Sequence, residues 1–349
     1  MEKTVVAVVG CGRISEAAHF PALSKMENVR IKYACDLIAE RAEDKKVRFG
    51  AENAIEDYHI ALDDPEVEVV YVLTQNFAHY TVTMDALKAG KHVFCEKPIT
   101  VNYELANEMF QQAKESGKLL NIGVCNRYHK SVVEIAQKVK NGELGDIYHI
   151  YCSFRSHRCI PGLGGEFTTK ASSGGGVLID WGIHFLDLIL YVIGGAKIKT
   201  VSADTYAKMA PTIDAYKYTG MWAGPPIENG TNDVEDYVTG YVRTDKCSIS
   251  FNGAWAENIG DGGMFIDFLG DKAGIRLQYG GQYTEFDNDL NVTESSGDIP
   301  NMYEVEDAAF INACKTGEHT RSYIENVIES QRLLQAIYDS AEAKKEIAL

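Results

Sequence analysis

The first 125 residues alternate short apolar runs with helical patterns, and this alternation constrains the fold more than any other feature of the chain. The apolar runs have the length of strands and lie at residues 4–9, 29–35, 69–73, 92–95 and 119–123. Helical patterns occupy 14–26, 38–49, 78–89 and 102–116, with a short βα piece at 53–62. Strands that alternate with helices predict a doubly wound parallel sheet. Runs such as TVVAVV are apolar throughout, as expected for parallel strands that are buried on both faces.

The pattern changes after Gly123. A helix is expected at 131–141, a strand at 147–154 and a Gly/Ser/Thr-rich stretch at 161–176, followed by an apolar helix. Residues 197–289 alternate between polar and apolar side chains and contain turn residues, which predicts a hairpin-linked antiparallel sheet. Helices at 303–316 and 323–345 complete the chain. We therefore expect an α/β domain at 1–124 and an α+β domain with a large, mainly antiparallel open sheet at 125–349, with the helix 323–345 packed back on the first domain.

Charge and cysteine content exclude several classes of function. The net charge of −16 disfavours binding to nucleic acid and to anionic membranes. No apolar run reaches the ~18 residues of a membrane span, and the N-terminus lacks the pattern of a signal peptide. The eight cysteines are scattered without a CxxC pair, which favours a reduced, cytoplasmic compartment and argues against a zinc site.

The segment VVGCGRIS at the end of the first strand has the pattern of a phosphate-binding turn. Gly10 allows the turn, Gly12 lets the backbone approach a pyrophosphate, and the following helix, from Arg13 and Ile14, supplies amide donors. Ser15 stands where a third glycine is usual, and it is small enough to preserve the packing of helix on strand.

Asp36 follows the second strand, where a carboxylate accepts hydrogen bonds from both ribose hydroxyls and repels a 2′-phosphate. We therefore expect NAD as cofactor, with NADP less favoured. Arg41 leaves alternatives open, because it could hold a 2′-phosphate, stack on adenine, or be a solvated charge on a helix.

Two further strand ends carry polar residues at the edge where open α/β sheets bind ligands. Thr74 and Asn76 follow one strand, and Glu96-Lys97-Pro98 follows another. Proline after lysine restricts the backbone and favours a turn or a cis bond that would aim Lys97 at the ligand. The alternative for any single lysine is a solvated surface charge.

The segment GGGVLIDWGIHFLD at 174–187 places charged groups on a largely apolar helix. At 100° per residue, Asp180, His184 and Asp187 share one face. Buried carboxylates and imidazoles need a partner or a function. The alternative is structural: Asp180 as a helix cap, His184 as a satisfied core histidine, and Asp187 as a charge paired elsewhere.

Together, GCGRIS, TQNFAHYTVTMDALKAGKHVFCEKP and GGGVLIDWGIHFLD resemble the Gfo/Idh/MocA family of oxidoreductases along essentially the whole chain. The resemblance implies a Rossmann domain, a nicotinamide cofactor, a sugar or polyol substrate, and a homodimer or homotetramer built through the open sheet. It also implies that Lys97, Asp180 and His184 are the working residues. Gln75 replaces the usual proline, and Leu163 replaces the tryptophan that is frequent in branches acting on glycosides.

These observations define two sets of candidate residues. The cofactor-facing set is Gly10, Gly12, Arg13, Ile14, Asp36, Arg41, Thr74, Asn76, His79, Glu96, Lys97 and Arg127. The substrate-facing set is Lys97, Arg127, Tyr128, Arg155, His157, Arg158, Asp180 and His184, with Tyr237 and Tyr283 as weaker candidates.

Our mechanistic hypothesis assigns His184 as the base that takes the proton of a secondary alcohol while its carbon transfers a hydride to nicotinamide. Lys97 would stabilise the developing alkoxide, and Asp180 would orient the imidazole or bind a neighbouring hydroxyl. This hypothesis requires the ammonium of Lys97 and the imidazole of His184 to act on the same substrate.

Three alternatives were weighed. The first keeps NAD bound and oxidises a sugar carbon transiently to cleave or epimerise a glycoside, and the loop after Phe154 leaves it open. The second is a non-catalytic dinucleotide-binding regulator, which would not need Lys97 or His184. The third is a metal-dependent dehydrogenase, which is rejected because the pair His157 and Cys159 matches no zinc-ligand spacing.

Overall fold

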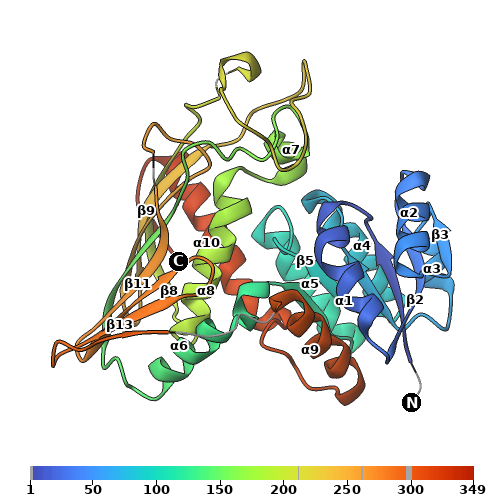
Figure 1. The fold of residues 1–349 in the computed structure, drawn as a ribbon, viewed down its shortest axis with the longest axis horizontal. Coiled ribbons are helices and arrows are strands. Elements are labelled where there is room, and N and C mark those ends of the chain that lie inside the picture. The colour runs from blue at the N-terminus through green and yellow to red at the C-terminus, as the bar shows by residue number, and fades with distance from the viewer. Residues whose placement is uncertain (1–2, 211, 261, 296–300) are drawn as a thin grey trace. The chain divides into compact units, whose positions relative to one another are not determined.

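The computed structural model describes residues 3–210, 212–260, 262–295 and 301–349, and the described chain forms two compact units. The first unit contains the residues up to Tyr128, the helix α9 and the chain as far as Ile328 (Figure 1). The second unit begins at His129 and also contains Glu329–Leu349. The division therefore falls close to the expected boundary after residue 124, but α9 joins the first unit instead of the second.

A six-stranded, all-parallel sheet forms the centre of the first unit, in the order β3-β2-β1-β4-β5-β6. Its strands are β1 (Thr4–Val9), β2 (Val29–Cys35), β3 (Asn53–Ile55), β4 (Val69–Val72), β5 (His92–Glu96) and β6 (Leu120–Gly123). The helices of this unit are η1 (Ser15–His19), α1 (Phe20–Lys25), α2 (Ala39–Phe49), α3 (His59–Asp63), α4 (Asn76–Lys88), α5 (Tyr103–Ser116), η2 (Cys125–Tyr128) and α9 (Met302–Thr316).

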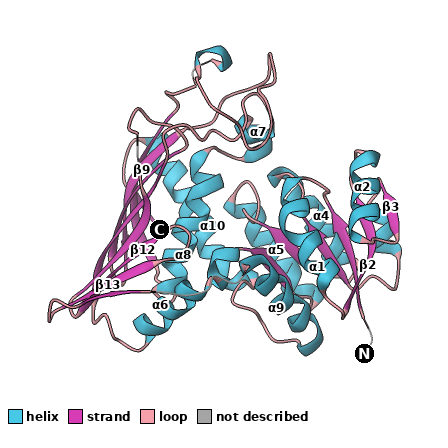
Figure 2. Cartoon of the chain, viewed as in Figure 1, coloured by secondary structure: helices cyan, strands magenta, loops and turns pink. Residues whose placement is uncertain are grey.

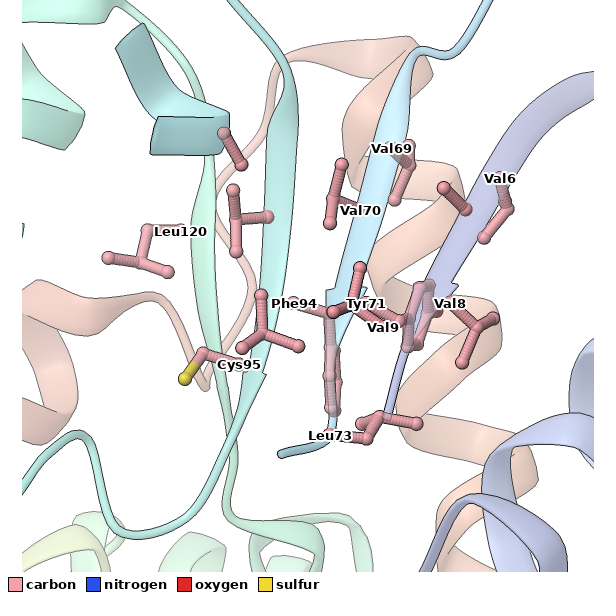
Figure 3. Packing of buried hydrophobic residues seen from close by; sticks show 14 of the residues in the cluster. Val6, Val8, Val9, Val69, Val70, Tyr71, Leu73, Phe94, Cys95 and Leu120 are labelled. Atoms are coloured by element: carbon pink, nitrogen blue, oxygen red, sulfur yellow. The ribbon is translucent and has the colours of Figure 1, made fainter. Parts of the chain in front are cut away.

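The direction of strand order reverses between β1 and β4, which is the topological switch point where doubly wound sheets bind ligands. Valines of β1 and β4 pack beside Tyr71 and Phe94 in the core of the sheet (Figure 3). Every residue of β1 and β4 is buried, so these strands need apolar side chains on both faces. The expected doubly wound parallel sheet is confirmed.

The second unit is built on a nine-stranded sheet in the order β14-β13-β12-β11-β7-β10-β9-β8-β15. Its strands are β7 (Ile147–Arg155), β8 (Ile198–Tyr206), β9 (Tyr237–Thr244), β10 (Ser248–Ala254), β11 (Met264–Gly270), β12 (Ala273–Gln278), β13 (Tyr283–Asp287), β14 (Val292–Glu294) and β15 (Ile347–Ala348). Neighbouring strands are antiparallel, with the exception of β7 and β10, which pair in parallel. The mainly antiparallel sheet is therefore confirmed, with one parallel pair near its centre.

Helices α6 (Lys130–Lys140), η4 (Leu178–Gly182), α8 (Ile183–Val192) and α10 (Ile324–Ala343) cover one face of this sheet (Figure 2). The other helices of this unit are short: η3 (Glu166–Thr168), α7 (Lys170–Ser173) and η5 (Ile213–Ala215). Strand residues alternate between this core and the other face, as in β12, where Ile275 and Leu277 are buried while Arg276 is exposed. The helix predicted at 323–345 is observed as α10, and its packing on the first domain stays a prediction. Val327 belongs to the first core, whereas Leu333 belongs to the second.

The stretch Lys170–Val192, which contains α7, η4 and α8, has the length and apolar composition of a membrane span, yet 78% of its most apolar window is buried inside the protein. Burial of this kind is typical of a core helix, and the stretch contains the segment that carries Asp180 and His184.

Candidate active site

The turn after β1 has the geometry that its glycines predict. Gly10 has φ +101°, and a Cβ at this position would lie 2.4 Å from the carbonyl oxygen of Leu73, so only glycine fits. A Cβ on Gly12, in contrast, would meet nothing within 4 Å, so the backbone there is open to an approaching group. Ser15 is buried and donates a hydrogen bond of 2.7 Å to the carbonyl oxygen of Gly12. Serine therefore replaces the third glycine without leaving a buried hydroxyl unsatisfied.

Asp36, at the end of β2, is held by the backbone on both carboxylate oxygens. Cys11 N donates to Oδ2 at 2.8 Å and Ile38 N donates to Oδ1 at 2.9 Å. The carboxylate is thus fixed beside the glycine turn. Arg41 lies nearby in α2 and is exposed, as is Arg13. An open backbone, an anchored carboxylate and two accessible guanidinium groups fit a dinucleotide with its pyrophosphate and ribose.

The loop after β4 is tied to the loop after β5 by His79 of α4. Its Nδ1 lies 2.8 Å from the carbonyl oxygen of Pro98 and its Nε2 lies 3.1 Å from that of Thr74. His79 is 1% exposed, and burial lowers its pKa. Asn76 begins α4 and is partly exposed beside these loops. His79 therefore supports the two loops from behind, and its direct contact with a cofactor stays a prediction.

Lys97 follows β5, and its peptide bond to Pro98 is cis. The side chain of Lys97 is partly exposed, whereas Glu96 is buried. The backbone N–H of Lys97 donates to Oε2 of Glu96 at 2.9 Å. Glu96 therefore holds the backbone of its neighbour, instead of presenting its carboxylate to solvent.

The helix that carries Asp180 and His184 begins with a π-helical turn, η4, before it becomes the α-helix α8. A π-turn holds one more residue than an α-helical turn, so it shifts the angular position of every later residue relative to the earlier ones. Gly182 lies within this turn, and a Cβ there would be 2.8 Å from Leu178 Cδ1 and 3.3 Å from Phe154 Cζ. The glycine thus permits close packing of the π-turn on β7.

The three charged residues that the sequence placed on one face differ in exposure and in hydrogen-bond partner. Asp180 and His184 are partly exposed, and Trp255 Nε1 donates to Oδ2 of Asp180 at 3.2 Å. Asp187 is 2% exposed and accepts a hydrogen bond of 2.6 Å from Ser330 Oγ. Asp187 is therefore held in the core by α10, in agreement with its structural alternative, and the shared face stays a prediction.

Glu235, which the sequence analysis missed, anchors the start of this helix. Its carboxylate accepts hydrogen bonds from Gly176 N at 2.9 Å, Leu178 N at 3.1 Å and the Tyr338 hydroxyl at 2.9 Å. Burial raises the pKa of Glu235, and these donors partly offset that effect. Cβ atoms on Gly175 and Gly176 would lie 1.9 Å from Tyr338 Oη and from the Glu235 carbonyl oxygen. The glycine run is thus required for contact with Glu235.

The basic residues at the end of β7 gather around Glu257. Arg155 Nη1 lies 3.3 Å from its carboxylate, His157 Nδ1 lies 2.8 Å from its carbonyl oxygen, and Arg158 Nη1 donates to the same carbonyl at 2.7 Å. The structure therefore brings these three predicted substrate ligands together. Tyr237 begins β9, which β10 separates from β7, and is partly exposed.

Arg127 and Tyr128 occupy a different environment, inside the first unit. Arg127 is 1% exposed and donates to the carbonyl oxygens of Arg321 at 2.7 Å and Asn326 at 2.8 Å. The guanidinium of Arg321 lies 5.0 Å from the ring centre of buried Tyr128. These contacts join η2 to the chain just before α10 and to the first turn of α10, so a ligand-binding role for either residue stays a prediction. Tyr283 is also buried, in β13.

The described ranges 3–210, 212–260, 262–295 and 301–349 contain no group of three His, Cys, Asp or Glu side chains able to hold a metal ion. Each of the eight cysteines lies in these ranges and is a free thiol.

Both units of the chain match known protein families. Residues 4–124 match the description "Oxidoreductase family, NAD-binding Rossmann fold", and residues 132–276 match the "GFO/IDH/MocA C-terminal domain". The D-glucoside 3-dehydrogenase of Escherichia coli K12 is 31% identical over 350 residues, which cover 99% of this chain and 97% of that protein.

Two further relatives extend the comparison. The NADP⁺-dependent scyllo-inositol 2-dehydrogenase IolW of Bacillus subtilis is 28% identical over 214 residues, or 61% of this chain and 58% of that protein. The solved structure of levoglucosan dehydrogenase in complex with NADH and L-sorbose superposes with a TM-score of 0.86 at 20% identity, covering 100% of this chain and 99% of that one. With both family domains matched in order and a relative similar over its full length, the chain belongs to the GFO/IDH/MocA family of oxidoreductases.

Proposed function

We propose that the protein is a nicotinamide-dependent dehydrogenase that oxidises a secondary alcohol of a sugar, glycoside or polyol. One observation carries this proposal: a chain similar over its full length to a D-glucoside 3-dehydrogenase has Lys97 after β5, and partly exposed Asp180 and His184 in η4 and α8. A bound nicotinamide supplies the hydride acceptor, and the residues of this chain supply binding and proton transfer.

His184 is the proposed base. The substrate hydroxyl gives its proton to the imidazole while the carbon–hydrogen bond breaks and its electron pair leaves with the hydride, so the products are a ketone, the reduced cofactor and a protonated His184. Imidazole suits this step because its pKa lies near working pH. Partial exposure of His184 supports the assignment, since a core histidine would not need it.

Lys97 and Asp180 are the proposed electrostatic groups. The ammonium of Lys97 stabilises the oxygen of the substrate as negative charge develops there. Asp180 accepts a hydrogen bond from Trp255, which leaves its carboxylate oriented to bind a neighbouring hydroxyl or to orient His184. Arg155, His157 and Arg158 are proposed substrate ligands, because a polyol needs several fixed donors.

We further propose NAD as the preferred cofactor. Asp36 is fixed at the end of β2 by two backbone donors, and a fixed carboxylate accepts from ribose hydroxyls while repelling a 2′-phosphate. Relatives that use NADP exist, so the preference is a property to measure on this chain.

A panel of sugars, glycosides and polyols with NAD and with NADP tests the proposal, read by the absorbance of the reduced nicotinamide. At least one polyhydroxylated secondary alcohol should give steady turnover, with a higher kcat/KM for NAD. Absence of turnover across the panel, together with absence of the reverse ketone reduction, would overturn it.

The transient-oxidation alternative keeps the same residues and differs in its products. It predicts protein that is purified with a bound cofactor, releases an aglycone from a glycoside, and accumulates no reduced nicotinamide. Mass spectrometry of the denatured protein, combined with product analysis, separates the two activities.

We propose that the open face of the nine-stranded sheet joins copies of the chain into a homodimer or homotetramer. Tyr151 and Tyr241 flank Ser250 in one row across β7, β10 and β9, and they are 39% and 37% exposed. Their neighbours Ile150 and Val242 are fully buried on the helix-covered face. Light scattering should give a mass that is a multiple of 38.6 kDa, and Tyr151→Glu should reduce that mass.

We also propose a cytoplasmic location. Free thiols at each of the eight cysteines support it.

A further inference from the structure

A histidine that the proposed mechanism does not use lies buried between two carboxylates in the first unit. His19, in η1, is 0% exposed. Its Nε2 lies 3.0 Å from Oε1 of Glu96, and its Nδ1 lies 3.0 Å and 3.1 Å from the two carboxylate oxygens of Asp307. A neutral imidazole has only one N–H, so contact of both ring nitrogens with carboxylates is satisfied by the imidazolium.

The surroundings of His19 favour a cation. Its ring centre lies 5.0 Å from that of Phe94, 5.8 Å from that of Tyr71 and 5.9 Å from that of Tyr303. Aromatic rings stabilise a desolvated cation. Burial by itself would lower the pKa of His19, but the carboxylates of Asp307 and Glu96 outweigh it and raise that pKa to about 10. The titratable groups that face the ring are thus Glu96 from β5, Asp307 and Tyr303 from α9, and Tyr71 from β4.

Glu96 connects this buried group to Lys97. One of its oxygens contacts His19, and the other accepts the backbone N–H of Lys97 at 2.9 Å. A Cβ on Gly123 would lie 2.8 Å from Oε1 of Glu96, so glycine at this position of β6 provides the space that the carboxylate occupies. Both oxygens of Glu96 are therefore fixed: Oε1 by the side chain of His19, and Oε2 by the backbone N–H of Lys97.

Asp307 reaches this cluster from a segment 288 residues away in sequence. It lies in α9, whose Phe310 and Ile311 are buried in the core of the first unit. Phe310 also packs on Tyr71 and Phe94, with ring centres 5.9 Å and 5.6 Å apart. The carboxylate is 0% exposed, so it has no counterion in solvent and depends on the imidazolium.

We propose that the His19 imidazolium and Asp307 are positioning residues for Lys97: Asp307 holds His19, His19 holds the carboxylate of Glu96, and Glu96 fixes the backbone of Lys97. This role rests on the proposed function, because it needs Lys97 to act on the substrate. It makes α9 part of the support of the active site, although α9 follows strands β7 to β14 of the nine-stranded sheet in sequence. Replacing His19 or Asp307 keeps the side chain of Lys97 but leaves its backbone less firmly held.

The charge state of His19 is tested first, by a measurement that does not depend on enzyme activity. In ¹⁵N-histidine-labelled wild-type protein at pH 8, the resonances that disappear in His19→Gln should be those of a ring protonated on both nitrogens. A neutral ring at that pH would overturn the proposal.

Steady-state kinetics of His19→Gln, Asp307→Asn and the double variant test the positioning. We expect each single change to lower kcat about 10- to 100-fold, since small misplacements of a reacting group have effects of this size. The KM for NAD should stay within about threefold, because the glycine turn and Asp36 are untouched. The double variant should lose about as much as either single variant, because the two residues act as one unit.

His92→Gln is the matched control. His92 begins the strand that Glu96 ends, and its Nδ1 accepts the backbone N–H of Leu119 at 3.1 Å. This variant should keep kcat within about twofold. If one variant does not fold, the other carries the test, since Asp307→Asn changes charge with almost no change of shape.

The variant Lys97→Met distinguishes failure of the positioning role from failure of the proposed function. An inactive Lys97→Met with wild-type kcat in His19→Gln and Asp307→Asn overturns the positioning role alone, as do losses that multiply in the double variant. An active Lys97→Met overturns the proposed function and the positioning role with it.

Discussion

Nε1 of Trp255 donates a hydrogen bond of 3.2 Å to Oδ2 of Asp180. Trp255 is 1% exposed and follows β10 directly, whereas Asp180 lies in the π-turn η4. The indole therefore links the central part of the nine-stranded sheet to the helix that carries His184. This contact fixes one oxygen of Asp180.

Replacing Trp255 with Phe keeps an aromatic ring and removes the donor. We expect kcat to fall about tenfold, because a hydrogen bond to a charged group contributes about 1.5–3 kcal/mol. Trp222→Phe is the control, since Trp222 is 50% exposed and packs edge-to-face on Phe167. Equal kcat values in the two variants would show that the Trp255 contact does not orient Asp180.

Gly10 and Gly12 should respond differently to the same added methyl group. Gly10→Ala places Cβ 2.4 Å from a backbone oxygen at φ +101°, so we expect a lower melting temperature. Gly12→Ala meets nothing within 4 Å, so its melting temperature should match that of wild type. Its KM for NAD should nevertheless rise about tenfold or more, because the methyl group occupies space proposed for the pyrophosphate. Thermal melts and cofactor titrations check both, and unchanged NAD binding in Gly12→Ala would contradict the assignment of this turn.

Asp36→Asn should relax the choice of cofactor. The amide keeps one acceptor for the backbone donors and removes the negative charge that repels a 2′-phosphate. We expect the ratio of kcat/KM for NAD to kcat/KM for NADP to fall about tenfold, equivalent to about 1.4 kcal/mol. Arg41→Ala distinguishes the roles left open for that residue: a loss with NADP alone indicates phosphate binding, and a loss with both cofactors indicates stacking on adenine.

Two histidines, the buried His19 and the partly buried His92, predict opposite slopes of the free energy of unfolding against pH. Because the pKa of His19 is raised to about 10, its stabilisation is complete below pH 6.5 and is lost as pH rises towards 10. Burial lowers the pKa of His92 to about 4, so its contribution is present above pH 6.5 and is lost as pH falls towards 4. Each proton corresponds to a slope of about 1.4 kcal/mol per pH unit. Urea unfolding at a series of pH values gives the free energy of unfolding as a function of pH. The alkaline slope of this curve should flatten in His19→Gln, and its acidic slope should flatten in His92→Gln. An unchanged alkaline slope in His19→Gln would contradict a charged His19.

The sequence predicted the first sheet well because each parallel strand is a short, continuous apolar run. The strand expected at 4–9 is observed as Thr4–Val9, and the one expected at 29–35 as Val29–Cys35. The pairing of strands in the second sheet was harder to predict from the sequence. Strands β7 and β10 pair in parallel although about ninety residues separate them, and alternation of polar and apolar residues does not reveal direction.

The candidate site was predicted by residue type and not by geometry. The shared face of Asp180 and Asp187 was predicted with a constant 100° per residue, and nothing in the sequence indicated the π-turn at Leu178–Gly182. The turn depends on contacts with Phe154 and Glu235, which are distant in sequence. His19 could have been noticed as a lone histidine in an apolar helix, but its partner Asp307 has no local signal. Long-range partners of this kind are the part that sequence patterns do not contain.

The central claim is that Lys97 and His184 act in one chemical step. The most direct measurement is kcat for Lys97→Met, His184→Ala and the double variant, on the substrate that the panel identifies. We predict a loss of about 10²-fold or more for each single variant and a loss in the double variant well short of the product. Wild-type turnover in either single variant would contradict the account.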